Sequence, residues 1–272
     1  MSIINYVLKF VQYKLINSAG AIMKTFILIL VISILSVHVL ESQVVNIESR
    51  RMRTDTTGWT GNAGASFQFS KSVDEIFDLG ALIHFQYKGK NDLWLFLNEL
   101  RMIKGAGTSF INSGFAHVRY NRKITKEMLR GEVFLQYQYN KALEVGQRVL
   151  AGGGPRFKII DTDMFRAYFA SLYMFEYQES VDKTIIERNH RTSSYLSFTL
   201  ELDKVEFSHT SYFQPNMRDV KDYRLLSQTD LKFKIFENLK FKTGFNYRFD
   251  TRPFPGVPKT TYYLNNGLEF EF

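Results

Sequence analysis

The sequence predicts an all-β protein, a closed antiparallel transmembrane β-barrel of about 12 strands that follows an N-terminal signal-peptide helix. Three observations support this fold class. Runs of about ten residues with alternating polarity recur along the chain, each followed by a turn. The composition of 25 Phe and 15 Tyr against only 5 Pro favours strands. The final run places apolar Leu264, Leu268 and Phe270 opposite polar Asn265 and Glu269 and ends the chain on an aromatic residue.

The first 42 residues are expected to form a signal peptide that is cleaved after Ser42. An almost wholly apolar stretch, Phe26 to Leu40, follows Lys24 and leads to that small residue. The stretch is shorter than the roughly 18 residues that a spanning helix needs, although a single membrane anchor is the alternative. Residues 1–22 would be an unusual leader, so translation starts at either Met1 or Met23.

Residues 43–58 are polar, charged and without periodicity, which predicts a periplasmic lead-in to the first strand. Arg50, Arg51 and Arg53 are interpreted as a solvated charge run rather than a site for an anionic headgroup. The barrel itself is expected to occupy residues 59–272.

The first six strands are predicted from apolar positions within residues 63–69, 81–87, 93–97, 116–120, 133–139 and 149–159. The third run is apolar on both faces, because Leu95 and Leu97 alternate with Trp94 and Phe96, so its facing stays open. In the sixth run, glycines 152–154 indicate a bend or a bulky neighbour lying over the backbone. Pro155 predicts a bulge there.

The other six strands are predicted within residues 165–177, 196–202, 205–213, 225–235, 239–249 and 264–272. Long polar loops, Glu179 to Asn189, Pro215 to Asp222 and Thr251 to Lys259, alternate with short turns at residues 161–163, 203–204 and 237–238. With both termini in the periplasm, the long loops would be extracellular, which is the usual asymmetry of such barrels.

Charged residues alternate with aromatic residues along these strands, which predicts a wet lumen and a lipid-facing apolar exterior. A soluble barrel would reverse the two faces. The net charge of +8 does not cluster, so nucleic acid is not an expected partner. The polar residues predicted to face the lumen are Arg148, Arg156, Lys158, Lys232, Lys234 and Glu269.

The C-terminus resembles the signal by which bacterial outer-membrane barrels are recognised for insertion. Asn265, Gly267, Phe270 and Phe272 occupy its polar, glycine and aromatic positions. The resemblance implies outer-membrane lipids and the barrel-assembly machinery as partners.

Four further stretches carry a family resemblance: Val45 to Arg51, Thr54 to Trp59, Asn112 to Tyr120, and Leu150 to Phe157. They are similar to the bacterial salt-induced outer-membrane proteins, a domain of unknown function. That resemblance implies a signal peptide and a barrel, and supplies no reaction or ligand.

We therefore expect a non-enzymatic outer-membrane barrel, either a narrow channel or an envelope-stress or envelope-integrity component. A ligand-binding surface receptor that uses the three long loops is one alternative. The five histidines lack metal-ligand spacing and there is no cysteine, so neither a metal nor a cofactor is expected.

A lipid hydrolase is the other alternative, because His209 and Ser211 share one face of a strand. The pair resembles the His-x-Ser strand of outer-membrane phospholipases and lipid A deacylases. However, Tyr212 and Phe213 follow it where the phospholipases have Asn-Gly, and the neighbouring runs supply no acidic or amide partner. A polar pair near the outer interface is the preferred interpretation.

Overall fold

The computed structural model describes residues 47, 51–52, 56–71, 75–105, 108–125 and 128–270, without the side chains of 108–110 and 269–270. The predicted signal peptide, residues 1–42, and the terminal Phe272 lie outside this part of the chain. Within it, no helix is long and apolar enough to cross a membrane.

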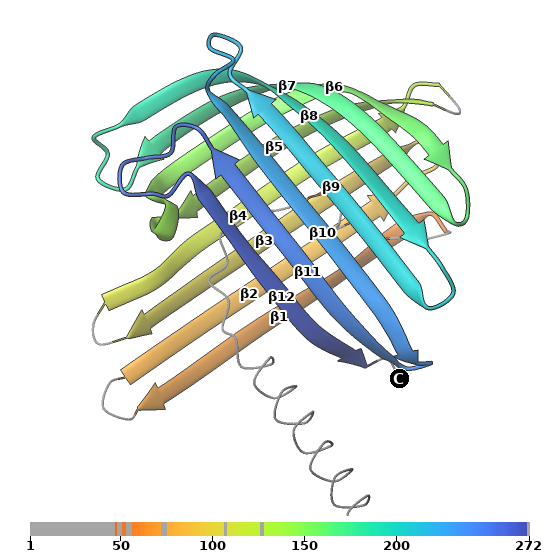
Figure 1. Cartoon of the computed structure of the whole chain (residues 1–272), viewed down its shortest axis with the longest axis horizontal. Helices are drawn as coiled ribbons and strands as arrows, with labels where there is room; N and C mark the ends of the chain where they lie inside the picture. The colour runs from red at the N-terminus through yellow and green to blue at the C-terminus, as the bar shows by residue number, and fades with distance from the viewer. Residues whose placement is uncertain are drawn as a thin grey trace, which may run out of the picture. The chain divides into compact units, whose positions relative to one another are not determined.

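Twelve strands are present in the described residues, as the polarity pattern predicted (Figure 1). A single 3-10 turn, η1 (Lys141–Leu143), stands between β5 and β6. The strands are β1 (Gly58–Lys71), β2 (Glu75–Lys88), β3 (Asp92–Gly105), β4 (Thr108–Lys123), β5 (Leu129–Asn140), β6 (Val145–Asp161), β7 (Phe165–Ser180), β8 (Ile186–Glu201), β9 (Val205–Pro215), β10 (Tyr223–Phe236), β11 (Leu239–Asp250) and β12 (Thr260–Phe270).

The strands form one antiparallel sheet in chain order, β1 to β12. The sheet curls through β6, β7 and β8, so that later strands return over earlier ones (Figure 1). In the described residues β1 pairs only with β2, and β12 only with β11, so the predicted closure of the barrel is not observed. Across the lumen, Tyr195 of β8 donates a hydrogen bond to Glu132 of β5, and Arg224 of β10 forms an ion pair with Glu176 of β7.

The sheet is polar inside and apolar outside, the reverse of a soluble protein. Its largest fully buried side chains include Arg156, Arg191 and Arg224, whereas Phe67 is 67% exposed and Leu135 is 56% exposed. Burying charge without a partner costs several kcal/mol, and exposing large apolar side chains gains nothing in water. This distribution fits a sheet with hydrocarbon around it.

Aromatic side chains gather on the outer face near the β2–β3 turn. The rings of Trp59 and Tyr87 are 5.1 Å apart, and those of Trp94 and Tyr120 are 4.5 Å apart. Amphipathic rings at this level are typical of the interfacial girdle of a transmembrane barrel.

The structure decides the facing of β3, which the sequence left open. Leu95 and Leu97 point inward and are 0% and 3% exposed, while Trp94 points outward and is 37% exposed. The inner wall therefore carries an apolar patch, which they form with Phe115 of β4.

In β6 the expectation for the glycines is confirmed. A Cβ on Gly152 would lie 2.7 Å from the ring of Phe134, and one on Gly154 would lie 3.0 Å from Cα of Leu172. The bulge expected at Pro155 is wrong. The β6–β7 register shifts between Lys158 and Ile160 instead, because Pro155 removes a ladder donor without adding a residue to the strand.

One loop is shorter than the polarity of its sequence suggested. Residues 186–189 belong to β8, and only residues 181–185 connect it to β7. Their polar side chains do not prevent strand pairing, because Glu187 accepts hydrogen bonds from Gln178 and from Asn189. The other two long loops, 216–222 and 251–259, are present as expected.

Candidate functional site

The lumen is the candidate functional site, because alternation along the strands points their polar side chains into it. These side chains are organised around two buried glutamates, Glu132 and Glu176, which are 1% and 0% exposed. Each of the two lies within ion-pair distance of three arginines.

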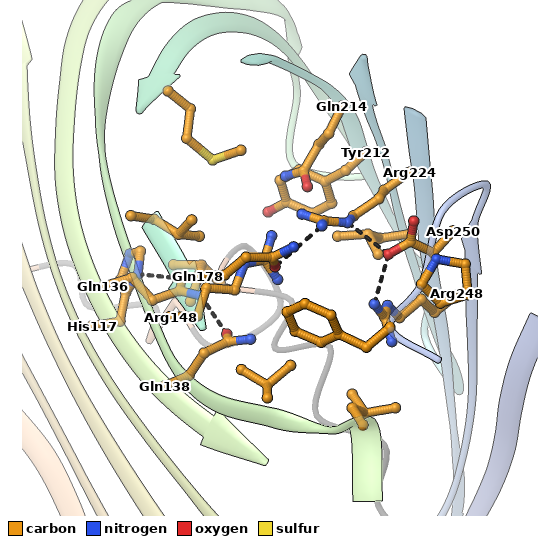
Figure 2. A pocket seen from close by; sticks show the side chains of 18 of the residues that line it. His117, Gln136, Gln138, Arg148, Gln178, Tyr212, Gln214, Arg224, Arg248 and Asp250 are labelled. Atoms are coloured by element: carbon orange, nitrogen blue, oxygen red, sulfur yellow. Dashed lines mark hydrogen bonds and ion pairs between the residues drawn. The ribbon is translucent and has the colours of Figure 1, made fainter. Parts of the chain in front are cut away.

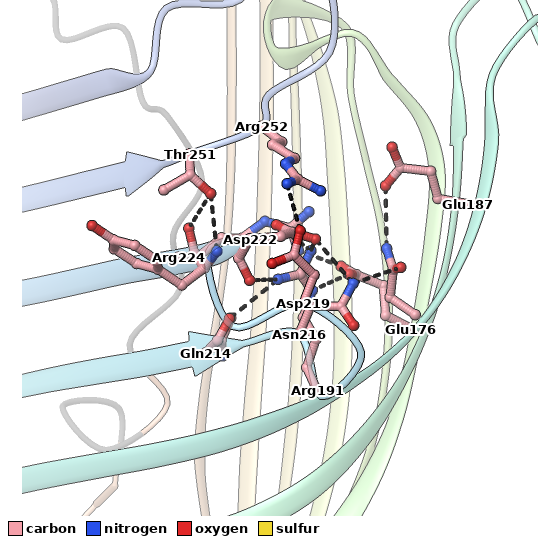
Figure 3. Close-up of polar contacts among 12 residues, drawn as sticks. Glu176, Glu187, Arg191, Gln214, Asn216, Asp219, Asp222, Arg224, Thr251 and Arg252 are labelled. Atoms are coloured by element: carbon pink, nitrogen blue, oxygen red, sulfur yellow. Dashed lines mark hydrogen bonds and ion pairs between the residues drawn. The ribbon is translucent and has the colours of Figure 1, made fainter.

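The first group of charges surrounds Glu176 of β7 (Figure 3). Its carboxylate accepts hydrogen bonds from Nε of Arg148 at 2.6 Å, from Nε of Arg191 at 2.7 Å and from Nη1 of Arg224. Arg148 comes from β6, Arg191 from β8 and Arg224 from β10. One carboxylate therefore holds together strands that are not neighbours in the sheet.

Two aspartates extend this group toward the loops. Arg191 donates to Asp222 at 2.9 Å, and Arg224 donates to Asp250 at 2.7 Å (Figures 2 and 3). Asp250 also accepts from Arg248 at 2.9 Å. The three carboxylates and four guanidinium groups balance to within one charge, as a buried cluster requires.

The second group of charges surrounds Glu132 of β5. Nη1 of Arg119 lies 2.9 Å from its Oε1, and the hydroxyl of Tyr195 donates to its Oε2 at 3.0 Å. Nε of Arg156 lies 3.9 Å from the same carboxylate and donates to Tyr195 at 3.0 Å. Arg51 approaches it to 3.6 Å. Here one carboxylate faces three cations, so positive charge is in excess.

Part of the predicted lead-in lies inside the lumen. Ile47 is 2% exposed and packs on Leu95, Leu97 and Phe115, the inward apolar patch of β3 and β4. Met52 exchanges two hydrogen bonds with the amide of Gln86. The sequence signal that could have revealed this contact was the apolar inner face of the third run, which has to be covered by something.

An apolar cluster lies at the end of the lumen that carries the long loops. Phe254 of the β11–β12 loop is 7% exposed and packs on Leu143 of η1 and Val145, with Ile185 and Val257 against them. A cavity of about 70 Å³ borders this cluster and is lined by both apolar and polar residues of several strands (Figure 2). A second contact joins this loop to the β9–β10 loop, because Arg252 binds Asp219.

The opposite end of the lumen opens into a larger space, called here the vestibule, of about 880 Å³. Among the described residues, its lining holds seven basic and three acidic side chains, a balance of +4. The basic residues are Arg51, Lys88, Lys123, Arg130, Arg156, Arg166 and Lys232, and the acidic residues are Asp92, Glu201 and Glu206.

The structure places the residues predicted to face the lumen in different settings. Arg148 and Arg156 are buried in the two groups of charges. Lys158 pairs with Asp161 at 2.8 Å, and Lys232 pairs with Glu206 at 2.9 Å. Lys234 lies opposite Lys240 near the end of β10, and the side chain of Glu269 lies outside the described residues.

Sequence reasoning missed the acidic partners at the centre of the lumen, Glu132 apart. Glu176 and Asp250 stand in runs dominated by aromatic residues, so their polarity did not mark them. Only the curl of the sheet brings Glu176 to Arg224, 48 positions away.

His209 and Ser211 do meet on the outer face of β9. Nε2 of His209 lies 2.8 Å from Oγ of Ser211, and Nδ1 lies 2.8 Å from Oγ1 of Thr229 on β10. Oγ of Ser211 donates to Ser227 at 3.3 Å. The imidazole is thus oriented by a neutral hydroxyl rather than by a carboxylate, and the whole group satisfies its own hydrogen bonds on an apolar surface.

In the C-terminal strand Asn265 pairs with Gly244, and Gly267 with Lys242 of β11. The side chain of Phe270 and all of Phe272 lie outside the described residues. The insertion signal therefore stays a prediction.

A family described as "Protein of unknown function, DUF481" matches residues 104–272, from the end of β3 to the C-terminus. No curated protein matches the chain.

Several solved structures are similar at low identity. A NanC porin is 12% identical over 77% of this chain and 99% of its own, with a TM-score of 0.45. A bacterial polysaccharide outer membrane secretin is 12% identical over 79% and 86%, with a TM-score of 0.46. The translocator domain of the autotransporter NalP from Neisseria meningitidis is 11% identical over 80% and 90%, with a TM-score of 0.42. At TM-scores below 0.5 these similarities carry no weight for function.

Proposed function

The chain belongs to the DUF481 family, and from that premise we propose that it is an outer-membrane β-barrel with a narrow, anion-preferring channel that is closed at rest. The inside-out distribution of polarity supports a place in a membrane. Insertion by the barrel-assembly machinery and export through a cleaved signal peptide are parts of the same proposal.

The observation that carries the proposal is the vestibule. Its excess of positive charge lies in a confined space, where low-dielectric walls concentrate the field and raise the local concentration of anions. A passage that begins in such a vestibule favours anions over cations of equal size.

Three features support a closed resting state. The two groups of ion-paired side chains lie within the lumen and come mostly from strands β4 to β11. Ile47 packs on the apolar patch of β3 and β4. Phe254 closes the loop end. Displacement of Ile47 from the apolar patch is the proposed route to opening.

In the membrane we expect β1 to pair with β12. Unpaired backbone groups in hydrocarbon cost several kcal/mol each, so an open edge is unfavourable there. The small residues of β1, with Gly61, Gly64 and Ala65 along it, allow another strand to approach closely.

The proposal assigns no reaction to the barrel. The hydrogen bonds of His209 to Ser211 and Thr229 are accounted for by the need to satisfy polar groups that face lipid. The inward turn of Phe254 also disfavours a receptor whose binding surface is the β11–β12 loop.

Planar-bilayer recording of the refolded mature chain tests the channel. Ile47→Asp places a carboxylate against Leu95, Leu97 and Phe115, so the segment should leave the lumen and stable currents should appear. Under a KCl gradient, the reversal potential should report a preference for chloride.

Ile47→Val is the matched control, because it keeps the apolar contact and should behave as the wild type. Wild-type channels should open rarely. If Ile47→Asp conducts no more than Ile47→Val, or if its currents prefer potassium, the proposed channel is wrong.

A further inference from the structure

The cavity that borders the apolar cluster of Phe254 has an excess of basic side chains in its wall (Figure 2). Among the described residues, five arginines and one aspartate line it. They are Arg119, Arg148, Arg224, Arg248 and Arg252, with Asp250. Asp250 is bound by Arg224 and Arg248, so the wall itself supplies no carboxylate for the other three arginines.

The ion-paired group around Glu176 carries one positive charge more than its carboxylates balance. Among the described residues it contains four arginines and three carboxylates, all at most 9% exposed. They are Arg148, Arg191, Arg224 and Arg248, with Glu176, Asp222 and Asp250. Because water screens buried charge poorly, an anion that reaches this group is stabilised by the surplus.

Two of the arginines in the cavity wall have donors that their carboxylates do not use. Nε of Arg148 donates to Glu176 at 2.6 Å, and Nη2 of Arg248 donates to Asp250 at 2.9 Å. In the part of the chain that the structure describes, the other guanidinium nitrogens of Arg148 and Arg248 make no hydrogen bond. The two side chains are 11% and 10% exposed and line the same cavity, so their remaining N–H groups are available to a ligand there.

A neutral donor and an apolar surface complete the wall. Oε1 of Gln138 accepts a hydrogen bond from Gln136 at 2.7 Å, while the amide nitrogen of Gln138 has no partner among the described residues. Leu150, Leu226 and Phe254 line the same space. A ligand with one anionic end and one short apolar end would therefore contact both kinds of wall.

The size of the cavity limits the ligand to a few heavy atoms. Its volume is about 70 Å³. A water molecule requires about 10–15 Å³ in a cavity, so this one accommodates about five groups of that size. A short aliphatic carboxylate fits, whereas a sugar or a nucleotide does not.

We propose that Arg148 and Arg248 bind one small monovalent carboxylate in this cavity, with Gln138 as a third donor and the apolar end of the ligand toward Leu226 and Phe254. The forked donors of guanidinium groups match a carboxylate, and one negative charge balances the surplus. The inference deepens the proposed function and rests on it for the route of the anion into the lumen. Binding itself does not require that the barrel conducts.

Saturation-transfer NMR on the refolded mature chain in detergent, at low ionic strength, tests the site with propionate as the probe. Propionamide is its neutral analogue of the same shape. Propionate should bind and propionamide should not, because only the carboxylate balances the surplus charge. Arg248→Gln should weaken propionate binding about tenfold or more, since it removes charge-assisted hydrogen bonds to the anion.

Arg148→Gln is a second variant, which should weaken propionate binding by a similar factor. Both variants should fold, because Asp250 still pairs with Arg224, and Glu176 still pairs with Arg191 and Arg224. Heat-modifiable mobility on gels checks that each variant is folded.

The matched control is Arg188→Gln. It removes the same charge from an exposed side chain that stacks on Tyr177 on the outer face, so the affinity should stay within about twofold. The site is wrong if the wild type does not bind propionate, if propionamide binds equally well, or if both cavity variants bind propionate as tightly as the wild type. Because no membrane is present, a loss of conductance in the bilayer experiment would leave this result standing, and a conducting barrel that binds no propionate would refute only the site.

Discussion

The substitution Glu176→Gln should destabilise the barrel more than any exposed charge substitution. Glu176 is 0% exposed and is bonded to three arginines. When the Glu176 carboxylate is removed, Arg191 still forms an ion pair with Asp222, and Arg224 still forms one with Asp250. Arg148 has no other carboxylate among the described ion pairs, so one buried guanidinium is stranded.

Stranding one member of a buried ion pair costs about 3–5 kcal/mol, and the single stranded arginine sets the expected loss in the free energy of unfolding. Urea unfolding of the refolded protein in detergent, followed by tryptophan fluorescence, measures this loss. Arg148→Gln in the same chain removes the stranded charge, so the double variant should recover part of the loss.

Glu75→Gln is the matched control, because Glu75 pairs with Lys71 at 2.8 Å and both side chains are more than half exposed. It should cost less than about 1 kcal/mol. A loss of that small size for Glu176→Gln, or a double variant no more stable than the single one, would show that the charges around Glu176 do not hold the curled sheet together.

Three other predictions follow from the structure. Gly154→Val should block assembly of the folded barrel, since its Cβ would lie 2.7 Å from the carbonyl oxygen of Ser171. Gly64→Ala should assemble normally, because a Cβ there would have nothing within 4 Å. The mobility of the folded form on gels distinguishes the two variants. The pKa of Asp219 is lowered, first by the backbone N–H of Lys221 and then by Arg252. The contact between Asp219 and Arg252 should therefore persist at pH 4 and be lost only as the pH falls through the lowered pKa. A carboxyl-carbon NMR titration, with Arg252→Gln as the comparison, checks the direction of the shift. Phospholipid incubated with the wild type should release no more fatty acid than with Ser211→Ala, and release that requires Ser211 would establish a hydrolase instead.

Much of the fold was predictable because a strand in a barrel repeats every two residues and has a different solvent on each side. The run from Glu132 to Asn140 shows this directly, since Val133, Leu135 and Tyr137 face outward and Glu132 and Gln138 are buried. The facing of β3 was not predictable, because both of its faces are apolar and only the position of Ile47 explains why.

The sequence predicted that the candidate site is a polar lumen, but it did not predict which side chains pair within it. The charged face indicated a polar lumen, and Arg148 and Arg156 were recognised as part of it. The central acidic partner Glu176 was not recognised, because it stands in a run dominated by aromatic residues and meets Arg224 only across the curled sheet. Which carboxylate neutralises which cation depends on distances across the lumen.

The sequence by itself determined the all-β class, the twelve strands, the alternation of polar and apolar residues along them, and the family. Each of these depends only on local alternation or on short stretches of residues. The tertiary structure alone decided the contents of the lumen. Curling the sheet placed Ile47 on an inner apolar patch and gathered three arginines around each buried glutamate. Electrostatic compensation depends on distance in space, and the order of residues along a strand does not specify it.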